Sequence, residues 1–223
     1  IPKPFDRRVL IWEAADVAEA AVNEGIAAIK PEDFDKQAYK ESLEARLGMS
    51  YSVMRGVFNQ VKGREKRIVF PEGDNEKVIR AAAQCVEQQI CVPILLGNEE
   101  SIRQTMSELN IEFDCEIINP RYDDRRIGNY DIHLLQNRSR KGMTTLDAQR
   151  LLKSRPYFAA QMVEIGDADG FLGGVSRNYA DVLRPCLEVI GSDEDSHCAI
   201  GCYMMVVKGR LISLGDATVN VYP

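Results

Sequence analysis

Apolar and polar positions alternate in blocks along the middle of the chain. Three short apolar runs, at residues 67–70, 90–97 and 113–120, have the length and side-chain content of buried strands. Between them, residues 74–89 and 98–110 carry apolar residues at helical spacing among charged ones. Strands and helices that alternate in this way predict an α/β fold with a right-handed, parallel sheet.

The residues before the first strand show only helical periodicity. Residues 7–24 form an apolar stripe that Asp6 is placed to cap and Gly25 to end, and residues 51–62 form a second amphipathic stripe. Residues 31–50 between them are polar, charged and free of β-branched residues, so we interpret them as a linker that turns helical. The pattern therefore predicts a helical arm in front of the sheet.

Beyond the third strand, residues 121–140 are rich in arginine, and we expect a basic loop there. Thr144 and Asp147 have the spacing of a capping box that starts one helix, and Pro156 suits the first turn of another, which we expect to end at Gly166.

The last part of the chain predicts strands again. Residues 168–174 predict a buried strand that runs into a glycine pair, and residues 176–191 predict a helix kinked at Pro185. The final stretch predicts two strands joined by a turn at Lys208-Gly209.

The composition excludes several classes of function. A net charge of −6 and a pI near 5.1 argue against nucleic-acid binding. No apolar run is long enough to span a bilayer and no secretory leader is present, so we expect a cytoplasmic protein that binds neither nucleic acid nor membrane. Six cysteines without CxxC spacing favour reduced thiols, and two histidines make a His-rich metal site unexpected. Because the chain begins with Ile-Pro, we expect a fragment or a processed form.

Carboxylates occur in two groups, and for both we favour a structural role. Glu72, Asp74 and Glu76 follow the first strand, where they suit a capped turn at a helix N-terminus. Asp167 and Asp169 occupy alternate positions of an extended segment, so they face opposite sides and do not converge.

The glycine pair and the cations near it give a sharper indication. Gly173 and Gly174 let a backbone approach a ligand closely, and a helix that starts near Ser176 or Asn178 would direct free N–H groups at the same space. Cations lie beside this loop and before the capped helix, at Arg138, Arg140, Lys141, Arg177 and Arg184.

Guanidinium groups bind phosphates bidentately and keep their charge, so the cluster favours an anionic small molecule. No P-loop, HExxH or GxSxG motif supports nucleotide hydrolysis, zinc proteolysis or a hydrolase elbow. The residues alone therefore indicate an α/β protein that binds a phosphorylated metabolite.

Several collinear stretches resemble successive motifs of the phosphate acetyltransferases: RIVFPEGDNEKVIRAA, NRSRKGMTTLDAQRLL, YFAAQMVEIGDADGFLGG, YADVLRPCLEVIG and LGDATVNVYP. Upstream, IPKPFDRRVLIWEAADVAEAAVNEGIA resembles the closing segment of a malic enzyme module. The two parts occur together in the bacterial hybrid NADP-dependent malic enzymes, and we expect this chain to be a piece of such a protein.

This resemblance implies a three-layer, parallel-sheet domain of the phosphate acetyltransferase and isocitrate/isopropylmalate dehydrogenase type. It implies a helical arm before that domain and the start of a second α/β domain after it. The implied division is residues 1–30 for the malic enzyme segment, 31–50 for the linker, 51–192 for domain I and 193–223 for the start of domain II.

The reaction of the family moves an acetyl group between coenzyme A and phosphate. By resemblance, Arg138 matches an arginine associated with coenzyme A, and Arg184 matches the arginine of an LRP motif associated with the substrate. Together with Gly173, Gly174 and Ser176 they are our predicted substrate-binding residues. We expect coenzyme A or acetyl-CoA to act as substrate or effector, and NADP and a divalent metal to belong to the malic enzyme module alone.

The sequence also departs from the family pattern. Gly173 stands where the family usually has serine, and VNVYP replaces VNPNP. The Ser-Arg pair and the Asp base of the family would lie beyond Pro223, so no catalytic residue is assigned and we expect this chain alone to be inactive. We expect the protein to form a homo-oligomer. Two other functions stay open: a regulatory module that senses acetyl-CoA, and a purely architectural scaffold for the oligomer.

Overall fold

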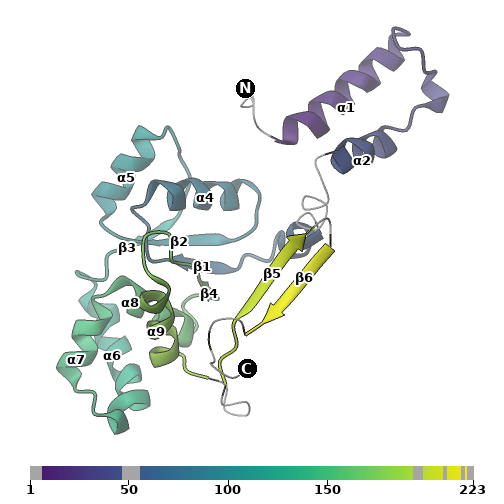
Figure 1. Ribbon diagram of the computed structural model, residues 1–223. Helices are drawn as coiled ribbons and strands as arrows, with labels where there is room; N and C mark the ends of the chain where they lie inside the picture. Colours follow the sequence, from purple (N-terminus) through teal and green to yellow (C-terminus); the bar gives the residue numbers. More distant parts are fainter. Residues whose placement is uncertain (1–6, 47–55, 193–197, 208–209, 217–218, 220–223) are drawn as a thin grey trace. The chain divides into compact units, whose positions relative to one another are not determined.

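The computed structural model describes residues 7–46, 56–192, 198–207, 210–216 and 219 (Figure 1). By its contacts the chain forms two units, one of residues 61–199 and one of residues 1–60 with 200–223. The predicted cap at Asp6 and the predicted turn at Lys208-Gly209 lie outside the described residues. The predicted domain boundaries after residues 50 and 192 adjoin segments that are not described, and the division stays a prediction.

The larger unit is built on a four-stranded sheet in the order β3-β2-β1-β4. Its strands are β1 (Arg67–Phe70), β2 (Val92–Leu96), β3 (Glu116–Ile118) and β4 (Gly170–Phe171), and all neighbouring pairs are parallel. The predicted parallel α/β class is thus confirmed. The expected buried strand at 168–174 is wrong in extent, because β4 holds only two half-buried residues at the edge of the sheet.

Helices cover both faces of this sheet, which gives three layers (Figure 1). One face carries α4 (Glu76–Glu87) and α5 (Glu99–Glu108). The other face carries α6 (Asp124–Arg138), α7 (Thr145–Leu152), α8 (Arg155–Glu164) and α9 (Tyr179–Val189).

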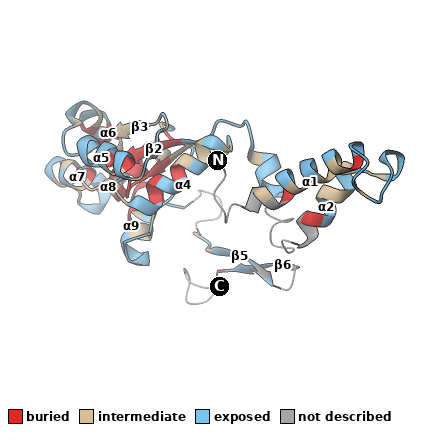
Figure 2. Cartoon of the chain, turned by 90° about the horizontal axis from the view of Figure 1, so that it is seen from above, coloured by how far each residue is buried: buried red, intermediate tan, exposed pale blue. Residues whose placement is uncertain are grey.

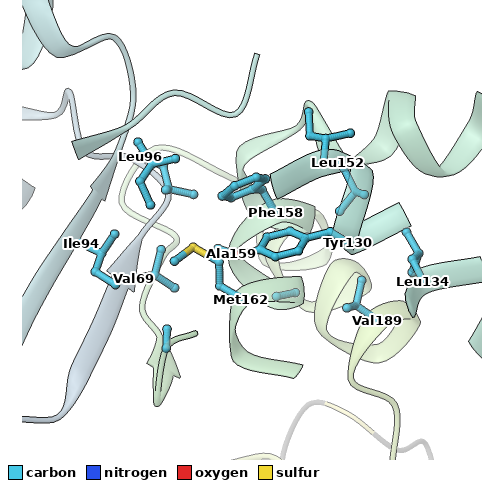
Figure 3. Packing of buried hydrophobic residues seen from close by; sticks show 14 of the residues in the cluster. Val69, Ile94, Leu96, Tyr130, Leu134, Leu152, Phe158, Ala159, Met162 and Val189 are labelled. Atoms are coloured by element: carbon cyan, nitrogen blue, oxygen red, sulfur yellow. The ribbon is translucent and has the colours of Figure 1, made fainter. Parts of the chain in front are cut away.

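Alternation along the strands supplies a core to each face, since successive side chains point to opposite sides. Phe70 and Leu95 pack with α4 and α5, whereas Val69, Ile94 and Leu96 pack with the other helices, among them Phe158 and Met162 of α8 (Figure 3). Buried residues accordingly gather on the sheet and on the helix faces turned toward it (Figure 2). Burial of each large apolar side chain stabilises the fold by about 1.5–3 kcal/mol.

The predicted basic loop at 121–140 is wrong, because most of it forms α6. The Asp123 side chain accepts the Arg126 N–H at 3.1 Å and so caps the helix. Ile127, Tyr130 and Leu134 then recur at helical spacing and are buried. The run of charged residues before Ile127, and the poor helix formers Gly128 and Asn129 after it, obscured the period in the sequence.

The helix ends follow the predicted signals closely. Thr144 and Asp147 form the capping box of α7, and Pro156 lies in the first turn of α8. Pro185 lies inside α9, as expected. The side chains of Asn75 and Asn98 cap the N-termini of α4 and α5, directly after the loops that follow β1 and β2.

In the smaller unit, α1 (Arg7–Asn23) packs against α2 (Lys36–Arg46), with a short 3-10 turn at Pro31–Asp33 between them. Gly25 follows α1 with a φ of 74°, as its predicted role at the helix end requires. Leu43 is buried, and Lys36 pairs with Glu19 at 2.6 Å, so the segment predicted as a linker also packs against α1. Residues 56–61 are helical.

The two predicted C-terminal strands are β5 (Cys202–Val207) and β6 (Arg210–Gly215), which pair antiparallel from Val207↔Arg210 to Cys202↔Gly215. Large apolar side chains of both strands remain exposed, for example Met204 and Leu211.

Gly73 provides a test of how tightly the loop after β1 packs on β2. A methyl group there would lie 2.8 Å from Leu95 Cβ and 2.9 Å from the Leu96 backbone nitrogen. We expect Gly73→Ala to lower the free energy of unfolding by about 1–3 kcal/mol in urea titrations, because backbone must shift. Gly128→Ala in α6, where nothing lies within 4 Å, serves as the control and should instead stabilise by about 0.5–1 kcal/mol. Equal effects at the two glycines would contradict this account.

Candidate functional site

A buried carboxylate joins the loop after β1 to the loop after β4. Glu72 is only 4% exposed. Its Oε2 accepts the N–H groups of Gly174 at 2.7 Å and Val175 at 2.8 Å, and its Oε1 accepts both the N–H of Ser176 at 2.7 Å and the Ser176 hydroxyl at 2.5 Å. The expected role of Glu72 at the start of α4 is therefore wrong, because Asn75 caps that helix.

These contacts also correct the expectation that the loop offers free N–H groups. The amides of residues 174–176 all donate to Glu72, and they do so around Gly174, whose φ of 106° suits only glycine. Burial favours the neutral carboxyl, but the donors on Ser176, Val175 and Gly174 outweigh burial and lower the pKa of Glu72. The Glu72 carboxylate thus takes up the hydrogen bonds of all three N–H groups.

A second contact ties the loop after β1 to the start of α8. Arg155 donates from Nη1 to Asp74 Oδ1 at 2.7 Å and from Nη2 to Oδ2 at 3.0 Å. Burial opposes ionisation of Asp74, but the hydrogen bond and charge of Arg155, helped by the charge of Arg177, lower its pKa. Sequence reasoning did not single out Arg155, whose only signal is its place beside the helix-starting Pro156.

Gly173 packs closely against the end of β4. A methyl group at this position would lie 2.9 Å from Cε2 of the Phe171 ring. The absence of a side chain at residue 173 therefore makes room for that ring.

A small open pocket of about 170 Å³ lies between α8 and α9. Its lining residues are Ser154, Pro156, Tyr157, Arg177, Asp181, Arg184 and Pro185. The fold thus brings two of the singled-out arginines, Arg177 and Arg184, to one hollow. A larger hollow of about 410 Å³ between α1 and α2 has a mainly apolar lining and no cation, so it does not suit an anion.

Tyr157, which lines this pocket, lies within the influence of both Arg184 and Arg138. The Tyr157 hydroxyl donates to Glu188 at 2.6 Å, and burial followed by this hydrogen bond raises the pKa of Tyr157 to about 12. The positive charges of Arg184 and Arg138, two residues that are distant in sequence, both oppose that rise. The Arg138 Nε is buried and has no hydrogen-bond partner among the described residues.

The other singled-out residues have different environments. Arg140 and Lys141 are exposed on the 3-10 turn Ser139–Lys141 and do not line the pocket. Asp167 accepts the Tyr130 hydroxyl at 2.5 Å, and Asp169 accepts the Arg67 N–H at 2.8 Å, so both are structural as expected.

No group of three or more His, Cys, Asp or Glu side chains in the part of the chain that the structure describes could hold a metal ion. No helix there has the length and apolar character needed to cross a membrane.

Taken together, a parallel α/β domain with a cation-lined pocket beside its strand-end loops defines a candidate anion-binding protein. Comparison with family models identifies the family. The model described as phosphate acetyl/butaryl transferase matches residues 52–223, and the chain belongs to this family.

Individual relatives agree with that assignment. The chain is 35% identical over its whole length to an NADP-dependent malic enzyme of Rhizobium meliloti, of which it spans 29%. It is 29% identical over 75% of its length to a phosphate acetyltransferase of Corynebacterium glutamicum, of which it spans 51%. A phosphotransacetylase structure from Streptococcus pyogenes superposes on 77% of this chain, and on 53% of its own, with a TM-score of 0.71 and 29% identity.

The Glu72 contacts give a prediction for stability and its dependence on pH. Glu72→Gln places an NH₂ group among N–H donors, so we expect a loss of about 2 kcal/mol at pH 7 in urea titrations. Because the folded pKa of Glu72 lies below the unfolded value of about 4.3, its stabilisation is fully present above that value. The stabilisation is lost as the pH falls through the folded pKa, so the difference between variant and wild type should shrink below about pH 4.

Glu76→Gln is the matched control, since among the described residues Glu76 pairs with exposed Arg80 alone, at 2.7 Å on the surface of α4. This change should stay within about 0.5 kcal/mol of wild type. A Glu72→Gln protein as stable at pH 7 as the control would contradict a structural role for the buried carboxylate.

Proposed function

We propose that this domain binds acetyl-CoA, acetyl phosphate or phosphate at the pocket between α8 and α9, as a phosphate acetyltransferase-type domain within a malic enzyme polypeptide. The observation that carries the proposal is the pocket that Arg177 and Arg184 both line. Two guanidinium groups near one small pocket suit a ligand with phosphate groups. The family assignment supports the same ligand class.

The arginines have separate roles in this proposal. Arg184 lines the pocket and is exposed, so its guanidinium can meet a phosphate that enters from solvent. Arg138 has a buried Nε without a partner, a donor that a bound phosphate oxygen would satisfy. Asp74 already neutralises Arg155, which leaves Arg155 to hold the loop and not the ligand.

The loop after β4 contributes to the proposed site by leaving space for the ligand. Gly173 and Gly174 have no side chains to obstruct a ligand, and Ser176 holds the loop in place through its bonds to Glu72. These residues bind the ligand in our proposal by allowing close approach of the backbone, because their N–H groups from 174 to 176 are already engaged.

The reaction of this class forms a bond between the coenzyme A sulfur and the acetyl carbon and breaks the bond from that carbon to a phosphate oxygen. The attacking thiol must lose a proton, and the departing phosphate carries negative charge. We propose that Arg138 and Arg184 orient the phosphate-bearing groups and offset that charge. We assign no base among the described residues.

A regulatory role is a second candidate function, and one comparison favours it. The likeness to malic enzymes extends over the whole chain, including the residues before the family match, at 35% identity to the relative from R. meliloti. In this alternative the same pocket binds acetyl-CoA and changes the rate of malate oxidation without acetyl transfer. If acetyl-CoA changes the rate of malate oxidation by the whole protein and no acetyl phosphate is formed, the regulatory role is favoured.

Replacement of Arg138 or Arg184 by Ala should weaken binding of acetyl-CoA or acetyl phosphate, measured by calorimetric titration at fixed salt. Loss of a charge-assisted, bidentate contact predicts a decrease of about 1.5–3 kcal/mol, roughly ten- to a hundredfold. Lysine at either position should restore binding only in part, because it keeps the charge and loses the planar fork.

Arg150→Ala is the control, since Arg150 lies on α7 with its side chain 81% exposed and pairs only loosely with Asp147 at 3.9 Å. Binding by this variant should equal that of wild type. If all three Ala variants bind alike, the pocket is not the anion site and the family likeness does not extend to this function.

A further inference from the structure

The C-terminal turn of α4 brings two cysteines together. The Ile90 N–H donates to the Cys85 carbonyl at 2.9 Å, and the Gln89 N–H donates to the Val86 carbonyl at 3.1 Å. Gln89 itself has a φ of 56°, in the left-handed region. This pattern of bonds reverses the chain at the helix end, so Cys91 leaves the turn beside the last turn of α4, where Cys85 lies.

Their side chains meet across this turn. The thiol groups of Cys85 and Cys91 interact with each other, and both residues are half-buried. None of the six cysteines, all of which lie in described segments, forms a disulfide. The pair therefore combines two thiols in contact with access for a small reagent.

The environment also differs between this pair and the other half-buried cysteines. The hydrogen bond from Cys91 lowers the pKa of Cys85, whereas burial raises the pKa of Cys115 and of Cys186. Since the thiolate is the reactive form, Cys85 has the properties of an attacking sulfur, and Cys91 those of its partner.

We propose that Cys85 and Cys91 form an oxidation site that hydrogen peroxide converts reversibly to a disulfide. The Cys85 thiolate attacks one peroxide oxygen, which forms an S–O bond, breaks the O–O bond and releases hydroxide. Hydroxide takes the Cys91 proton to give water, and the Cys91 sulfur then attacks the Cys85 sulfur and displaces a second hydroxide. Each sulfur loses one electron and the peroxide gains both. A low-molecular-weight thiol reverses the reaction by exchange.

The site is separate from the candidate anion pocket. Cys91 precedes β2, so the pair lies at the amino end of that strand, whereas the pocket is lined by α8, α9 and Arg177 in the segment that follows the carboxyl end of β4. The new bond would join the end of α4 to the start of β2 without touching Arg138 or Arg184. Oxidation at this site can therefore be tested independently of ligand binding.

The test is peroxide treatment of the native protein at neutral pH, followed by N-ethylmaleimide, trypsin and mass spectrometry. One tryptic peptide, residues 81–103, contains both Cys85 and Cys91 and no other cysteine. We expect this peptide to lose two hydrogens and to accept no maleimide after oxidation, and to accept two maleimides once dithiothreitol has been added. Without peroxide, iodoacetamide should label Cys85 on the order of tenfold faster than Cys115 or Cys186.

Cys91→Ser is the diagnostic variant, and Cys186→Ser is its control. Cys91→Ser should trap Cys85 as a sulfenic acid that dimedone labels, whereas Cys186→Ser should form the disulfide as wild type does. The proposal is overturned if wild-type peptide 81–103 still accepts two maleimides after peroxide has oxidised other cysteines. A rate of iodoacetamide labelling at Cys85 no greater than at Cys115 and Cys186 would also overturn it. Both measurements use the wild-type protein, so neither requires a variant to fold.

Discussion

The carboxylate of Glu72 is the contact on which the arrangement of the candidate site depends. A charged acceptor with four donors in a buried position binds them more strongly than a neutral one would. It fixes the end of β1 against the segment that leads into α9. That segment carries Arg177, and α9 carries Arg184, so a change at residue 72 would be transmitted to the pocket wall. Asp74 and Arg155 add a second tie, from the same loop to α8.

The charge of the whole chain gives little information about the pocket. The net charge is −6, yet the cations that matter are distinguished by their partners and not by their number. Arg155 is fully engaged by Asp74, and Arg177 lies close enough to that carboxylate to lower its pKa. The positive charges of Arg138 and Arg184 both act at Tyr157, which lines the pocket, and there they oppose the effect of Glu188. A small domain can therefore be acidic overall and still attract a phosphorylated ligand at one place.

Local signals in the sequence predicted the parallel sheet, the capping box at Thr144 and the helix ends near Gly25 and Pro156 correctly, because each depends on residues close together in the chain. Helix α6 was missed because charged residues lead into it and because Gly128 and Asn129, which disfavour a helix, stand between its buried positions. The role of Glu72 was missed for a different reason. Its donors lie about a hundred residues away, and no spacing along the chain reports a contact of that range.

The packing of Gly173 against Phe171 restricts the order in which this loop can change during evolution. A side chain at residue 173 would meet the aromatic ring, so the two positions are energetically coupled. A lineage that exchanges Gly173 for serine must first, or at the same time, accept a smaller residue at 171. In an alignment of close homologues, glycine at position 173 should then occur with phenylalanine at 171, and serine at 173 with a small residue at 171. The combination of serine at 173 with phenylalanine at 171 should be rare.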